Sequence, residues 1–155
     1  MIDVARVIEL PVAPPEAWRT LWDVAKLARC VPGCDDVQDV EPPHRYRATV
    51  RQRVGPFHVE LPLDVVVDSL EDGARLAVKA TGRDTVLSSP VKVSMVVALA
   101  AGGPGTVLTL QGKADVGGKL AGLGQGVIQR KTRDVLDEFA ANLEQLLKAR
   151  DGGGA

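Results

Sequence analysis

Side chains capable of chemistry are few in this sequence and widely spaced. The two histidines, His44 and His58, fall on the polar side of alternating segments, where an exposed side chain is far commoner than a base or a metal ligand. The two cysteines, Cys30 and Cys34, flank a Pro-Gly turn, have no neighbouring histidine and do not match a zinc framework. We therefore expect buried small thiols, no catalytic residue and no metal site.

Charge and motifs exclude several other classes of protein. Acidic side chains lie almost entirely on polar faces, so no carboxylate pair is placed to share a buried site. There is no phosphate loop or dinucleotide fingerprint, and we expect no cofactor. The net charge of −1 gives no electrostatic reason to expect nucleic acid as a partner.

Three polar side chains are predicted to face an apolar interior: Tyr46, Gln52 and Thr132. Thr132 could instead bond to its own helix carbonyl, and the Tyr46 hydroxyl could reach solvent. An apolar concavity with a few polar groups is typical of a site for a hydrophobic small molecule. The residues that we expect to line it are Trp22, Tyr46, Val50, Gln52, Leu61, Leu63, Val78, Met95, Leu110, Gly124, Ile128 and Thr132.

The first elements that position these side chains are one strand and two short helices. Residues 2–10 alternate as a strand does, and Pro14 and Pro15 suit a helix start. The apolar side of residues 17–27 is interrupted near Asp23, so we expect two short helices in a V.

From residue 37 the hydrophobic period becomes two, which predicts successive antiparallel strands. Because no crossover helices intervene, the sheet should be apolar on one face and exposed to solvent on the other. The last helix should cover the apolar face. The fold class is thus α+β, with about seven strands. The clearest strands of this meander are predicted over residues 46–54, 57–67, 76–82, 91–99 and 108–116.

Arginines on one face of the first long hairpin raise the question of a nucleic-acid surface. If Gly55-Pro56 is a two-residue loop, Arg51 faces Glu60 and Arg47 faces Asp64. The arginines are then neutralised across the strands, which favours a solvated charged face.

Residues 117–148 are predicted to form one long helix. Its docked face consists of Val135, Leu136, Phe139, Leu143, Leu146 and Leu147. Near its start this face carries Ile128, Gly124 and Ala121, so the glycines either permit close packing or a kink, or leave a space above the sheet. An apolar edge turned away from the sheet is formed by Leu120, Leu123 and Val127.

The length of 155 residues suits one domain, which we place at 1–149, followed by a flexible glycine-rich tail at 150–155. No apolar run approaches 18 residues and no charged-then-apolar start occurs, so we expect neither a membrane span nor a signal peptide. A cytoplasmic location is therefore expected.

Several motifs carry a resemblance to a known family. They are Pro14–Trp18 with Leu21 and Asp23, Cys30–Cys34, Val54–Pro56, and Ala114–Gly124 running on to Ile128, Phe139 and Leu143. Together with the order of elements, they resemble the helix-grip superfamily (SRPBCC, START and Bet v 1-like) and, more narrowly, the CoxG family of carbon monoxide dehydrogenase subunits. The chain departs from the family pattern at Asp84–Pro90, where members usually have a glycine-rich strand link.

The resemblance implies a curved antiparallel sheet wrapped around a long C-terminal helix. It also implies a non-catalytic accessory protein that joins a molybdenum-containing carbon monoxide dehydrogenase, or a related hydroxylase, to the inner face of the cell membrane. Its ligand would be an apolar molecule of quinone or lipid type. Leu120, Leu123 and Val127 would then form an edge suited to the bilayer or the partner.

Two alternatives stay open. Some relatives with this fold cyclise, hydrolyse or isomerise small apolar molecules, and an enzyme here would depend on Tyr46 or Gln52. A structural assembly subunit with a filled interior would instead use Gly122 to Gly126 only for tight packing.

Overall fold

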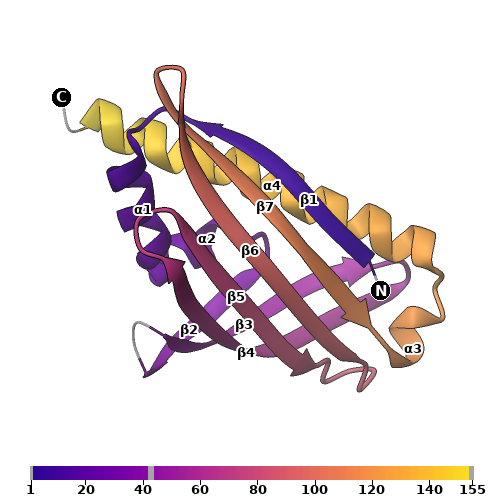
Figure 1. Cartoon of the computed structure of the whole chain (residues 1–155). Helices are drawn as coiled ribbons and strands as arrows, with labels where there is room; N and C mark the ends of the chain where they lie inside the picture. Colours follow the sequence, from indigo (N-terminus) through magenta and orange to yellow (C-terminus); the bar gives the residue numbers. More distant parts are fainter. Residues whose placement is uncertain (1, 42–43, 154–155) are drawn as a thin grey trace.

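The computed structural model describes residues 2–41 and 44–153. Over these residues the chain forms one curved sheet, two short helices after the first strand and a long C-terminal helix (Figure 1). In chain order the elements are β1 (Ile2–Leu10), α1 (Pro14–Trp22), α2 (Val24–Cys30), β2 (Cys34–Glu41), β3 (Arg45–Val54), β4 (Phe57–Glu71), β5 (Arg75–Arg83), β6 (Pro90–Gly102), β7 (Gly105–Val116), α3 (Gly118–Ala121) and α4 (Gln125–Gly153).

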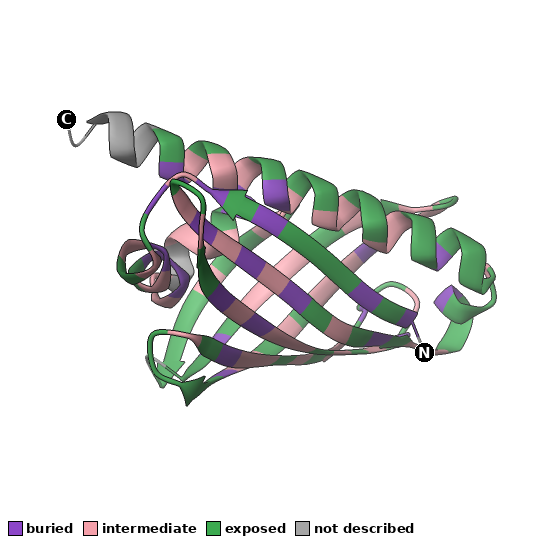
Figure 2. Ribbon diagram, turned by 45° about the horizontal axis from the view of Figure 1, so that its top comes forward, coloured by how far each residue is buried: buried purple, intermediate pink, exposed green. Residues whose placement is uncertain are grey.

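The sheet has seven strands in the order β1-β7-β6-β5-β4-β3-β2, and every neighbouring pair is antiparallel. Strands β2 to β7 form a meander, and β1 adds to its far edge beside β7. Figures 1 and 2 show the sheet curling round so that α4 runs along its open side, next to β1. The predicted α+β helix-grip architecture is confirmed.

The hairpin of β3 and β4 has the predicted register. Arg51 lies opposite Glu60 and Arg47 opposite Asp64. The Nε atom of Arg47 donates to Asp64 over 3.1 Å, and that of Arg51 donates to Glu60 over 3.3 Å. Gly55 has a φ of +58°, a value that favours glycine in this tight connection. These arginines are therefore paired with acids on the outer face, as the sequence indicated.

The long helix predicted over residues 117–148 is interrupted. A short helix α3 ends at Ala121, and α4 begins only at Gln125. Gly124, between them, has a φ of +96°, which L side chains rarely adopt. The glycines thus break the helix. At the other end α4 continues to Gly153, while residues 154 and 155 of the predicted flexible tail lie outside the described residues.

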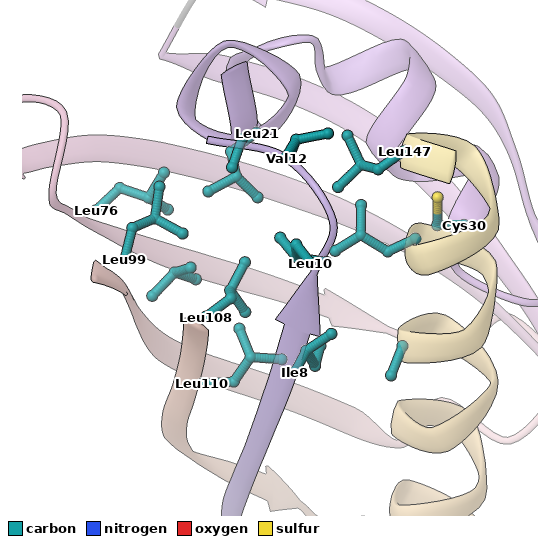
Figure 3. Close-up of a cluster of buried hydrophobic side chains, with 14 of the residues drawn as sticks. Ile8, Leu10, Val12, Leu21, Cys30, Leu76, Leu99, Leu108, Leu110 and Leu147 are labelled. Atoms are coloured by element: carbon teal, nitrogen blue, oxygen red, sulfur yellow. The ribbon is translucent and has the colours of Figure 1, made fainter. Parts of the chain in front are cut away.

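Two clusters of buried side chains hold α4 against the sheet. The larger lies beneath α1, α2 and the C-terminal half of α4 and includes Leu108, Leu143 and Leu147, which are all inaccessible to solvent (Figure 3). The smaller, at the other end, consists of Ile2, Val4, Ala114 and Ile128. Since each large buried side chain contributes about 1.5–3 kcal/mol, the helix is anchored mainly through its C-terminal half.

The segment between β5 and β6 is tied down by a buried carboxylate. Asp84 accepts hydrogen bonds from the backbone N–H of Glu60 (2.8 Å) and of Leu87 (2.5 Å). The Oγ atom of buried Ser89 accepts one from the N–H of Leu120 over 3.1 Å. This segment therefore links β4 to the start of α3.

Replacing Asp84 by alanine should lower the free energy of unfolding by about 2–3 kcal/mol, because two backbone donors lose their charged acceptor. Urea unfolding with linear extrapolation measures the change. The control is Asp64→Ala, which removes an exposed ion pair and should cost about 1 kcal/mol or less. Equal costs for the two variants would contradict this role of Asp84.

Candidate functional site

Between the two core clusters, the inward face of the sheet keeps part of its solvent exposure. Val50 pairs with Leu61 across β3 and β4, and Val78 pairs with Met95 across β5 and β6. All four side chains are apolar, face the interior and are only half-buried. Inward apolar side chains in a fully packed interior would be buried, so packing over this part of the sheet is incomplete. We call this region the inner band.

The predicted ligand-binding residues fall into three groups. Those that are half-buried on the inner band or at its border are Trp22, Val50, Gln52, Leu61, Leu63, Val78, Met95 and Thr132. Tyr46, Leu110 and Ile128 are buried, the last two within the core clusters at either end. Gly124 lies in the exposed break before α4, and nothing would touch a Cβ built on it.

The polar groups of this region are engaged in the structure itself. The Thr132 hydroxyl donates to the Ile128 carbonyl over 2.8 Å, which is the alternative that the sequence left open. The Gln52 amide donates to the Pro32 carbonyl. Burial raises the pKa of the Tyr46 hydroxyl, and Asp39 and Asp23 raise it further, so this phenol stays protonated near neutral pH.

Both cysteines are free thiols, Cys30 buried and Cys34 half-buried. Burial raises the pKa of each thiol, and the charge of Asp35 raises that of Cys34 further. A raised pKa is the opposite of what a nucleophilic thiolate needs. The motif between them serves packing instead: Gly33 has a φ of +79°, and a Cβ there would lie 1.9 Å from the Arg51 carbonyl oxygen.

No group of three or more His, Cys, Asp or Glu side chains among residues 2–41 and 44–153 is arranged to hold a metal ion. His44 is exposed, with its Nδ1 atom 3.0 Å from the Val67 carbonyl oxygen and its ring edge-on to Trp22. His58 is exposed as well. The arrangement therefore offers shape and apolar surface more than reactive groups.

An open pocket of about 580 Å³ lies where the β3–β4 hairpin, the turn before β2, the β5–β6 loop and α4 meet. It is lined by Pro32, Gly33, Arg51, Gln52, Arg53, His58, Val59, Glu60, Val86 and Lys131. Of the predicted site residues only Gln52 is among them. Local periodicity places Arg53 on a wet strand face and says nothing about Lys131, so the pocket was missed. The one available signal was that Arg53 lacks the cross-strand acid that Arg47 and Arg51 have.

The apolar edge predicted from a straight helix is partly wrong. Leu120 is only 3% exposed, because the break after α3 turns its side chain into the protein. Leu123 is half-buried over the hairpin turn, with its Cδ1 atom 3.5 Å from the position of a Cβ on Gly55. Val127 is 37% exposed. In the described part of the chain, no helix is both long enough and apolar enough to span a bilayer.

A curved seven-stranded sheet, two short helices after the first strand and a long C-terminal helix over a partly open apolar face define a Bet v 1-like, helix-grip protein. The chain belongs to the CoxG family of carbon monoxide dehydrogenase subunits, which matches residues 8–148. The family resemblance that the motifs indicated is thereby confirmed. Comparison with curated proteins gives no match.

Solved structures agree with this fold. A conserved protein from Geobacillus kaustophilus superposes with a TM-score of 0.84 at 21% identity, covering 96% of this chain and 97% of that one. Protein Ms6760 from Mycobacterium smegmatis gives 0.68 at 16% identity, covering 96% and 92%. Ara h 8.0201 gives 0.64 at 17% identity, covering 96% and 98%. At these identities the likeness concerns the fold alone.

Proposed function

We propose that this protein is a non-catalytic accessory protein that binds a hydrophobic small molecule, of quinone or lipid type, between the sheet and α4. The observation that carries the proposal is the inner band, where Val50, Leu61, Val78 and Met95 point inward and stay only half-buried, although Val78 and Met95 also pack against the core clusters. Covering such surface with an apolar ligand is favourable by about 25 cal/mol per Å². A structural subunit with a filled interior would bury these side chains as fully as Leu108.

The enzyme alternative has less support. It depends on Tyr46 or Gln52, and Tyr46 holds its proton while Gln52 is bonded to Pro32. Neither group is prepared to move a proton at neutral pH.

The family suggests the partner. CoxG proteins are named for carbon monoxide dehydrogenase. We propose that this protein connects a molybdenum hydroxylase of that type with the inner face of the cell membrane, from the cytoplasm. The surface that would serve this contact is a reduced edge of Leu123 and Val127, since Leu120 is buried.

Filling the inner band should abolish ligand binding. Leu63→Trp places a large side chain in the space, whereas Val66→Trp adds the same side chain to the outer face of the same strand. Titration with the neutral fluorophore Nile red should show binding weakened at least about tenfold by the first substitution and unchanged by the second. Circular dichroism checks that both variants fold. Undiminished binding by a folded Leu63→Trp variant would refute an interior site.

Changing Leu123 to Asp should remove membrane association while leaving the fold intact, since a charge replaces an apolar contact at a half-buried surface position. Flotation with liposomes of phosphatidylethanolamine and phosphatidylglycerol measures the association. Val7→Asp is the matched control, because Val7 is an exposed valine (62%) on β1, away from this edge. Unchanged flotation of the Leu123→Asp variant would remove this edge from the proposal.

A further inference from the structure

Three connections meet at the end of the molecule that carries α3: the β3–β4 turn, the β5–β6 loop and the link between α3 and α4 (Figure 1). Leu123 of the link rests over Gly55 of the turn. The backbone N–H of Leu120 in α3 donates to the Oγ atom of Ser89 in the β5–β6 loop. Val86 of that loop lines the open pocket together with residues of the hairpin. We call this region the hairpin end.

Apolar side chains from all three connections or their neighbours are accessible at the hairpin end. Val86 is 63% exposed, the largest value among the large apolar side chains that the structure describes. Val127, in the first turn of α4, is 37% exposed, and Leu123 is half-buried. A single exposed valine is ordinary on a protein surface, but several at one end indicate a contact surface.

Positive charge gathers around these apolar side chains. The cations come from the hairpin, the β5–β6 loop, α3 and the first turns of α4, and they are Arg53, Arg83, Lys119, Arg130 and Lys131. None of them forms an ion pair with any residue within 2–41 and 44–153. Arg83 donates to a backbone carbonyl of its own loop and keeps its charge. On α4, Val127 lies three and four positions before Arg130 and Lys131, so they share one side of the helix.

Acidic side chains at the hairpin end compensate little of this charge. Glu60 is already paired across the hairpin, and Asp84 is buried with two backbone donors. Asp115 lies opposite Lys92 on the neighbouring strand, and exposed Asp134 follows one helical turn after the α4 cations. Because the whole chain has a net charge of −1, this excess of cations gives the molecule a positive pole at the hairpin end.

We propose that the hairpin end docks on a bilayer surface that is rich in anionic lipids. Val86, Leu123 and Val127 enter the head-group region, and the cations around them face the negative charge of the lipids. Each lysine or arginine near such a surface strengthens binding about fivefold. The inference rests on the proposed function, since the edge of Leu123 and Val127 is shared. It adds Val86, a preference for anionic lipid, and an orientation in which the open pocket lies next to the bilayer.

The test is co-sedimentation of the full chain with vesicles of phosphatidylcholine alone and with vesicles in which about a third of the lipid is phosphatidylglycerol. The natural protein should bind the anionic vesicles at least about tenfold more tightly. A Lys119→Gln, Arg130→Gln double variant should bind them about tenfold or more weakly, because two exposed cations are lost. An ionic strength of about 1 M should abolish the preference, since the Debye length falls to about 3 Å.

The matched control is the Arg75→Gln, Lys79→Gln double variant, which loses the same charge from exposed positions on β5 away from the hairpin end. It should bind both kinds of vesicle as the natural protein does, and circular dichroism verifies that both double variants fold. Equal binding to the two kinds of vesicle, or an equal loss in both double variants, overturns the inference and leaves the interior ligand site standing. If neither kind of vesicle binds the natural protein, the proposed membrane contact falls together with this inference, while Nile red binding still reports on the interior site.

Discussion

One long helix has to cover most of one face of a seven-stranded sheet, with α1 and α2 covering only one end, and this difference in width governs the structure. Seven strands spaced about 4.8 Å apart span roughly 29 Å, whereas a helix with its side chains is about 10–12 Å wide. The sheet must therefore curl around α4, and even then the helix does not reach every inward side chain. Contacts concentrate where Leu143 and Leu147 meet the larger cluster and where Ile128 meets the smaller one. The inner band between them is left half-buried.

The same difference in width explains why the two ends of the molecule are packed differently. The end of the molecule with α1, α2 and the C-terminal half of α4 is a packed core, and the opposite end is held by few side chains. The break at Gly124 allows α3 to fold back, so that Leu120 can donate to Ser89 while Leu123 rests over the hairpin turn. The open pocket with Arg53 and Lys131 lies on this less packed side. The packed core and the open pocket therefore lie in different parts of one fold.

Much of this architecture could be predicted from the sequence, because alternation of apolar residues is a local signal. It identified the strands, the register that sets Arg51 opposite Glu60, and the docked face with Leu143 and Leu147. The helix break could not be located, since the glycines near Gly124 are compatible with both a weak helix and no helix. The prediction that Leu120 is exposed was wrong for the same reason, since its side chain is buried.

The candidate site was predicted only in part. The alternation of side chains along each strand placed Val50, Leu61 and Met95 on the interior face. Alternation cannot show, however, whether an inward side chain is covered by another element. The open pocket is lined by Lys131 of α4 and Arg53 of β3, two residues that are 78 positions apart in the sequence. Only the tertiary packing of helix, hairpin and loop brings them together, and no spacing in the sequence encodes it.

The most direct measurement is native mass spectrometry of the purified protein, followed by organic extraction of whatever it carries. An occupied inner band should appear as an apolar molecule bound to each chain, or as uptake of an added isoprenoid quinone or lipid by protein purified empty. A protein that is empty as purified and also ignores every added apolar molecule would contradict an interior binding site. The half-burial of the inner band would then have to be explained by assembly alone.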